Sequence, residues 1–143
     1  CLGTTIKKAR SQLKFRRVDF EYSLAFAKYA KESGATKISL VSSVGANHTS
    51  KNFYLRVKGE LEEAVKKINF EQTNIYHPSL LIGSRAESRL IEQFGQKLSS
   101  VINLFLFGSL KKFRSIEAKK LSKCIASPKD SMGVNYYSYK DFI

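Results

Sequence analysis

The chain has 143 residues, of which 43% are hydrophobic and 26% are charged. This composition is ordinary for a folded globular domain, and the length allows a single moderate hydrophobic core. Lys and Arg outnumber Asp and Glu by 25 to 12, which gives a net charge of +13. Such a charge is typical of nucleic-acid-binding proteins, but the basic residues are spread along the chain and do not alternate with aromatic residues as in single-strand binders. We therefore expect a solvated basic surface and no nucleic-acid partner.

The Cys and His residues argue against a disulfide framework and against a metal centre. Cys1 and Cys124 are the two cysteines, too few for a disulfide-stapled fold. His48 and His77 stand alone, with no Cys/His spacing of the zinc type. The most apolar run, 101–107, is far shorter than the ~20 residues that span a bilayer. We predict a cytoplasmic protein in a reducing compartment, with no membrane partner.

The first forty residues predict a helix followed by a parallel strand. Residues 1–5 are typical of a strand end that turns into a loop, and the basic stretch 7–17 indicates a surface loop or a short helix. Asp19 is suited to cap a helix that runs to Ser33, where Ser-Gly ends it. The β-branched run 37–41 then predicts a buried strand. The apolar stripe expected on the helix comprises Phe20, Leu24, Phe26, Ala27, Tyr29 and Ala30.

The predicted strand 37–41 ends on two serines, Ser42 and Ser43. Successive strand residues point to opposite faces, so we expect one hydroxyl to enter a cleft and the other to face the sheet; we choose Ser43 for the cleft. The Gly-, Asn- and Ser-rich segment 45–52 predicts a loop at the rim of that cleft. A helix with apolar residues along one side is expected at 53–68.

Tyr54 and Lys58 lie four residues apart, which places both on one face of that helix. A free tyrosine has a pKa near ~10, and a neighbouring ammonium stabilises the phenolate, so such a pair suits proton exchange with an alcohol or carbonyl oxygen. The same spacing recurs at Tyr136 and Lys140. That copy follows no strand and serine, so we interpret it as chance. We interpret Tyr54 and Lys58 as functional because Ser43, at the end of a predicted strand, precedes them.

The remaining sequence predicts alternating strands and helices. His77-Pro78 leaves a strand, and the fixed φ of proline explains a turn there. His77 is open to two interpretations, a ligand or proton relay and a structural residue; we favour the structural one. The elements expected are a strand at 73–76, a helix at 85–99, a buried strand at 101–107, a helix at 115–126 and a strand at 134–138.

Together these motifs resemble the short-chain dehydrogenase/reductase superfamily, with its Ser and Tyr-x-x-x-Lys. The resemblance is closer to an atypical branch, the Tat-interacting-protein-type oxidoreductases, which are relatives of the NmrA-like group. It is carried by Cys1-Leu2-Gly3-Thr4-Thr5, Arg17-Val18-Asp19, Ser42-Ser43-x-Gly45-Ala46, Tyr54-Leu55-x-Val57-Lys58-Gly59-Glu60 and Pro78-x-x-Leu81.

The resemblance implies an α/β fold, the back half of a Rossmann-type doubly wound parallel sheet. The N-terminal nucleotide-binding βαβ portion would precede Cys1, so we expect a single partial domain over 1–143. Within it, 1–84 would form the catalytic strand–helix–strand core, and 85–143 the substrate-side helices and last strand. An apolar, unpaired edge is expected at Cys1–Thr4.

The resemblance also implies the site and its ligands. Ser43 would donate a hydrogen bond to the substrate oxygen, Tyr54 would exchange the proton, and Lys58 would bind the nicotinamide ribose. The cofactor expected is NADP, or NAD, and the substrate a small carbonyl compound or alcohol. The cofactor-binding set implied is Gly3, Thr4, Tyr54, Lys58, Pro78, Ser79 and Leu80.

Three functions remain open at this stage. The first is an NAD(P)-dependent oxidoreductase of the short-chain type, inactive as this fragment because half of the cleft would be missing. The second is a non-catalytic dinucleotide-sensing or protein-interaction module, against which the complete Ser, Tyr and Lys set argues. The third is nucleic-acid binding through the positive charge, which would show a steep dependence on salt.

Overall fold

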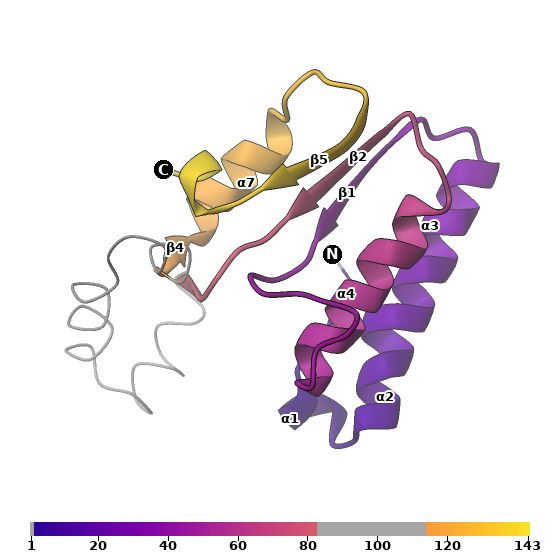
Figure 1. The fold of residues 1–143 in the computed structure, drawn as a ribbon, viewed down its shortest axis with the longest axis vertical. Coiled ribbons are helices and arrows are strands. Elements are labelled where there is room, and N and C mark those ends of the chain that lie inside the picture. The colour runs from indigo at the N-terminus through magenta and orange to yellow at the C-terminus, as the bar shows by residue number, and fades with distance from the viewer. Residues whose placement is uncertain (1, 83–113) are drawn as a thin grey trace.

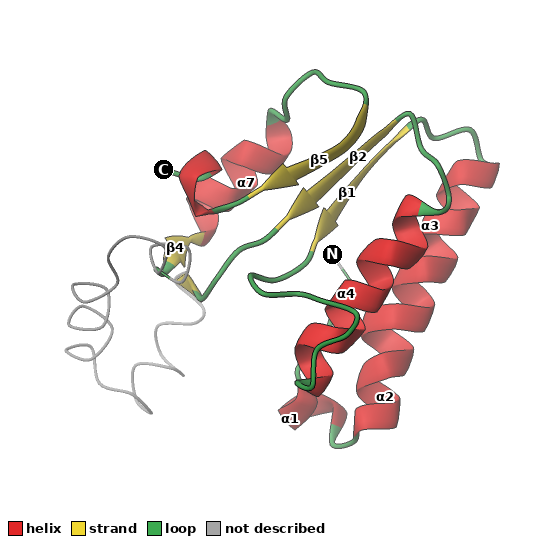
Figure 2. Ribbon diagram, viewed as in Figure 1, coloured by secondary structure: helices red, strands yellow, loops and turns green. Residues whose placement is uncertain are grey.

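A computed structural model of the chain describes residues 2–82 and 114–143. Its centre is a parallel sheet of three strands, β1 (Lys37–Val41), β2 (Gln72–Tyr76) and β5 (Gly133–Tyr137), with β2 in the middle. Figure 2 shows the three arrows pointing the same way. Every residue of β2 is buried, as expected for a parallel strand covered on both faces. The observed strands agree with the predicted ones to within one residue at either end.

Helices cover both faces of the sheet (Figure 1). Helices α3 (Ser23–Glu32) and α4 (Phe53–Lys66) lie against one face, and α7 (Ala118–Ala126) lies against the other. The chain is therefore α/β, with an arrangement compatible with part of a Rossmann-like fold.

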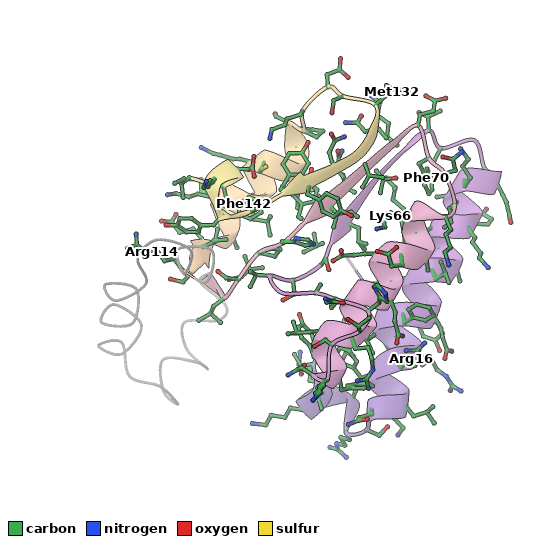
Figure 3. The ribbon with its side chains drawn as sticks, viewed as in Figure 1. Arg16, Lys66, Phe70, Arg114, Met132 and Phe142 are labelled. Carbon is green, nitrogen blue, oxygen red and sulfur yellow. The ribbon has the colours of Figure 1, made fainter. Side chains whose placement is uncertain are left out.

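Each face of the sheet has its own hydrophobic core, and Figure 3 labels one phenylalanine from each, Phe70 and Phe142. The two cores pack separately because the sheet lies between them. The core beneath α3 and α4 contains Ala27, Leu61, Val65 and Phe70, and the core beneath α7 contains Tyr76, Ile116, Leu121, Tyr137 and Phe142.

Asp19 does not cap a helix, contrary to the sequence-based prediction. After the short helix α1 (Ile6–Ala9), Ser11 caps α2 (Gln12–Arg16), its side chain accepting a hydrogen bond from the backbone N–H of Lys14 at 3.1 Å. The helical backbone then continues through the π-helical segment η1 (Arg17–Tyr22) into α3. Asp19 thus lies inside the helix, where it is 2% exposed.

The predicted apolar stripe on this helix is partly wrong. Ala27 is 1% exposed, and Phe20 and Leu24 pack against the core under α4. Phe26 and Tyr29 are 60% and 69% exposed, because in a regular helix these two positions lie away from the side that carries Phe20, Leu24 and Ala27.

Residues 2–5 form no strand, although a strand end was expected there. Thr5 has an extended backbone and caps α1, its side chain accepting a hydrogen bond from the N–H of Lys8. The segment is instead tied to η1, because the N–H of Thr4 donates to Asp19 at 2.8 Å. In the described sheet β1 is therefore an edge strand, paired with β2 alone.

Residues 116–117 form a short strand and do not open a helix. Strand β4 (Ile116–Glu117) pairs in parallel with β3 (Leu81–Ile82), and α7 begins one residue later. Two-residue strands carry too little pattern to be predicted from sequence. The predicted helix at 85–99 and strand at 101–107 lie outside the described residues.

The 3-10 helix η3 (Tyr139–Asp141) closes the C-terminal end through a capping box between Ser138 and Asp141. Lys129 Nζ also lies 2.7 Å from Asp141 Oδ1. Burial alone would raise the pKa of Asp141, but the hydrogen bonds from Lys129 and Ser138 hold it below its ordinary value.

We expect Asp141→Asn to lower the free energy of unfolding by about 1 kcal/mol at pH 7, the usual value of a cap. A carboxyl whose folded-state pKa is depressed stabilises the fold above its unfolded pKa and loses that contribution as the pH falls through the folded value. The gap between variant and wild type should therefore close as the pH falls below ~4. Urea unfolding at several pH values tests this, and a gap that is constant with pH would contradict it.

Candidate active site

A pocket of about 490 Å³ lies at the carboxyl edge of the sheet, beside the ends of β1 and β2. Its size is within the usual range for small-molecule sites, and this edge is where open parallel sheets bind ligands. One wall is the N-terminal segment Leu2–Thr5, another is α4, and α7 contributes Leu121 and Ile125. The sequence-predicted residues that line the pocket are Gly3, Thr4, Ser43, Tyr54, Lys58, Pro78 and Ser79.

Ser42 and Ser43 follow the end of β1 and both line the pocket, but their hydroxyls have different partners. Ser43 is half-buried at the pocket wall, and its Oγ lies 3.5 Å from the carbonyl oxygen of Val44. Ser42 is 6% exposed, and its hydroxyl donates to the carboxylate of Glu62 on α4. The long contact to Val44 leaves the Ser43 hydroxyl available to a ligand, whereas the Ser42 hydroxyl is committed to the protein.

Helix α4 brings Tyr54 and Lys58 to the pocket one turn apart. The helix begins at Phe53 because Asn52 caps it, with its side chain accepting from the N–H of Leu55 at 3.1 Å. The Tyr54 ring is half-buried and packs at 5.8 Å from the ring of Phe15, which is fully buried. Lys58 Nζ lies 5.9 Å from the centre of the Tyr54 ring. The Lys58 ammonium therefore lies beside the Tyr54 ring, one helical turn along α4.

Asp19 is a site residue that the sequence-based reasoning missed. Its carboxylate accepts a hydrogen bond from Lys58 Nζ at 2.7 Å and another from the N–H of Thr4 at 2.8 Å. The Lys58 side chain is 12% exposed and that of Asp19 is 2% exposed. The pair therefore fixes the ammonium at the pocket wall and ties the N-terminal segment to α4.

A sequence signal for Asp19 existed. It lies one helical turn after the apolar Phe15, and a carboxylate on an apolar helix face is rarely buried unless it is paired; the partner itself cannot be seen in the sequence. π-Helical segments inside α-helices are also frequent at functional sites, but this one cannot be seen in the sequence.

The segment after β2 contributes two of its three predicted residues to the pocket. Pro78 and Ser79 line it, and the carbonyl oxygen of Pro78 accepts from the N–H of Val44 at 2.9 Å. Leu80 is 52% exposed and is not part of the pocket wall. Its carbonyl oxygen instead accepts from the N–H of Ile116, next to the β3–β4 pair.

Gly59 lets the rim loop pack directly on α4. The loop folds back on the helix, with the N–H of Asn47 donating to the carbonyl oxygen of Leu55 at 3.1 Å. A Cβ on Gly59 would lie 2.3 Å from the backbone of both Asn47 and His48. A side chain at residue 59 therefore requires the loop to move.

We expect Gly59→Ala to destabilise the fold by about 1–3 kcal/mol, the usual cost of overpacking, less the gain of up to ~1 kcal/mol from better helix propensity. The displaced loop should also be cleaved faster by a protease between residues 45 and 52. Chemical denaturation and limited proteolysis measure both effects. A variant as stable and as resistant as the wild type would show that the loop is not held against Gly59.

The second Tyr-x-x-x-Lys copy has no comparable setting. Tyr136 is on β5 and is 48% exposed, and Lys140 is on η3, so no single helix carries them. Neither residue lines the pocket.

Two further observations concern the described residues, 2–82 and 114–143. No helix there is long and apolar enough to cross a membrane. No three His, Cys, Asp or Glu side chains there are grouped so that they could hold a metal ion.

The fold and the pocket define a class: an α/β protein with a pocket at the carboxyl edge of a parallel sheet. Comparison with known proteins identifies particular relatives. The chain is 44% identical over 86 residues to Protein FMP52, mitochondrial, of Candida albicans, a match covering 60% of this chain. It is 40% identical over 110 residues to Protein HTATIP2 of Rattus norvegicus, covering 77% of this chain. It is 43% identical over 91 residues to Protein fmp52, mitochondrial, of Emericella nidulans, covering 64% of this chain. No protein-family model matches the chain.

These relatives support the resemblance that the motifs indicated, over part of their own length. The matches cover 38%, 42% and 39% of the three relatives, so the chain spans about two-fifths of their length. Two of the three, and further relatives from other fungi, are named as mitochondrial. The prediction of a cytoplasmic location is therefore wrong. Composition and cysteine count carry no signal that distinguishes the cytoplasm from mitochondria.

Proposed function

We propose that the protein containing this chain is a nicotinamide-dependent oxidoreductase that interconverts a small carbonyl compound and its alcohol. The observation that carries the proposal is that Ser43, Tyr54 and Lys58 line one pocket at the carboxyl edge of a parallel sheet. They come from two elements that only the fold brings together, which separates this set from a chance Tyr-x-x-x-Lys. The relatives support the same assignment.

The side chains of the pocket suit a proton transfer. Tyr54 is the general acid or base, because its phenol is half-buried and has an ammonium one turn away. Ser43 donates a hydrogen bond to the substrate oxygen and so fixes its position. Lys58 stays on the pocket wall beside Tyr54 because Asp19 holds it.

The pocket is compatible with the nicotinamide end of the cofactor, NADP or NAD. Lys58 and Asp19 place a donor and an acceptor side by side at the wall, which suits ribose hydroxyls. A Cβ at Gly3 would lie 3.7 Å from Asp19 Oδ1, so a side chain there would fill space beside this pair. Pro78 and Ser79 also line the pocket. The nicotinamide, when bound, supplies or accepts the hydride.

Cofactor oxidation tests the proposal. The protein that contains this chain should bind NADPH or NADH and oxidise it in the presence of one or more members of a panel of aldehydes and ketones. Dinucleotide binding without turnover would instead support the dinucleotide-sensing module. Absence of both binding and turnover would overturn both interpretations of the site.

The names of the relatives carry a second proposal, that the protein is mitochondrial. Fractionation of the source cells should place it with mitochondrial markers. Recovery with cytosolic markers would contradict the proposal.

A further inference from the structure

A second polar cluster is formed by Ser42, which itself lines the pocket, and by Glu62 and His77, which do not. One oxygen of Glu62, Oε1, accepts from the hydroxyl of Ser42 and lies 2.9 Å from Nε2 of His77. The side chain of Glu62 is 7% exposed and that of His77 is 24% exposed. The three residues come from three elements, so the cluster exists only in the folded chain.

Packing does not account for a carboxylate at residue 62. Glu62 follows the core residue Leu61 and lies three residues before the core residue Val65. Burying a carboxylate costs free energy that its partners only partly restore, and an apolar residue of similar volume is often as stable or more so. The carboxylate is therefore better explained by what it holds in place than by stability.

The cluster ties together the two chain segments that form the pocket wall. Ser42 and His77 each follow the last residue of a strand, β1 and β2. The next residue of each segment, Ser43 or Pro78, lines the pocket. The N–H of Val44 donates to Pro78 at 2.9 Å, so the two segments also pair beyond the strands.

Three further side chains form a chain of contacts that leads away from His77: Tyr136, Lys66 and Glu63. The ring of His77 lies 5.6 Å from that of Tyr136 on β5, whose hydroxyl accepts from Lys66 Nζ at 3.3 Å. Lys66 is also paired with Glu63 at 2.5 Å, and the hydrogen bond from Lys66 lowers the pKa of that carboxyl. Lys66 is thus paired with Glu63 and not with Glu62. The carboxylate of Glu62 has His77 and Ser42 as its side-chain partners.

We propose that Glu62 is a positioning residue that holds the Ser42–Val44 and His77–Ser79 segments in register, so that Ser43 meets the substrate oxygen. The inference rests on the proposed function for its catalytic consequence, but the structural coupling is independent of it. Glu62 itself does not line the pocket. Its effect passes through Ser42 and His77, the two residues that its carboxylate contacts.

Three variants and a matched control test the inference in the protein that contains this chain. Ser42→Ala removes the link to the serine segment, Glu62→Leu removes both bonds and keeps the volume, and Glu62→Gln keeps an oxygen acceptor. The control is Glu63→Gln, the neighbouring carboxylate on the same helix, whose side chain is 43% exposed and which does not line the pocket.

We expect Ser42→Ala and Glu62→Leu to lower kcat by about ten- to a hundredfold, the effect of misplacing a positioned group, with dinucleotide affinity unchanged. Glu62→Gln should retain most of kcat, and Glu63→Gln all of it. A merely structural residue would lower the unfolding midpoint and leave kcat of the folded fraction unchanged. Wild-type kcat in Ser42→Ala and Glu62→Leu would overturn the inference.

Amide hydrogen exchange by NMR separates failure of this inference from failure of the proposed function. In Ser42→Ala the amide of Val44 should exchange at least tenfold faster, while that of Ile75, inside β2, keeps its protection. We expect this faster exchange even if the protein binds no dinucleotide and reduces no carbonyl compound. Such an absence would overturn the proposed function and leave the positioning role intact. Unchanged protection of Val44 would overturn the positioning role. Because Ser42→Ala removes a single hydroxyl, the test stands even if Glu62→Leu fails to fold.

Discussion

Replacing Tyr54 with Phe should lower kcat of cofactor oxidation by about 10²–10⁴-fold, the usual contribution of a general acid or base. The substitution removes the phenolic oxygen and keeps the ring that packs against Phe15 at 5.8 Å. The free energy of unfolding and the dinucleotide affinity should therefore change little. Steady-state kinetics with a carbonyl substrate, together with urea unfolding, measures the two effects separately.

The chain provides its own control for this prediction. Tyr136 has the same spacing to Lys140, but it is on a strand and its ring is 48% exposed. Tyr136→Phe should leave kcat unchanged. Equal losses in Tyr54→Phe and Tyr136→Phe would indicate a general effect of removing a phenol, and an active Tyr54→Phe variant would remove Tyr54 from the reaction.

The parts of the fold with strong local patterns were predicted from the sequence. Strand β1 has the predicted bounds, 37–41, because its β-branched run is enclosed by turn residues. Helix α4 begins at Phe53 as predicted, because Asn52 can cap it. Helical spacing also places Tyr54 and Lys58 together on α4, whereas the choice of Ser43 over Ser42 stays a prediction, because both serines line the pocket.

The parts that depend on tertiary contacts were not predicted. Asp19 looks like a helix cap in the sequence, but Ser11 takes that role eight residues earlier and the helix runs through Asp19. The burial of Glu62 is equally hidden, since its partners Ser42 and His77 follow two different strands. Long-range pairing of buried polar groups leaves no periodic signal in a single sequence.

The Asp19–Lys58 pair should be among the most strongly coupled in the described part of the chain. Asp19→Asn leaves a lysine that is 12% exposed without its carboxylate. Breaking a buried pair by removing one partner costs about 3–5 kcal/mol, and we expect the lower end because Lys58 retains some contact with solvent. The amide of Asn can still accept from the N–H of Thr4, so the loss reports on the charge.

A double-mutant cycle isolates the interaction. Lys58→Met removes the ammonium and keeps most of the volume of the side chain, and the double variant Asp19→Asn/Lys58→Met then buries no unpaired charge. Its loss in unfolding free energy should be smaller than the sum of the single losses by about 1–3 kcal/mol, the coupling typical of residues in contact. Both Lys58→Met and Asp19→Asn should weaken dinucleotide binding, since one removes the cation and the other the group that positions it. Additive losses would mean that Asp19 and Lys58 do not interact energetically. Asp19 would then not be a residue that positions Lys58 in the site.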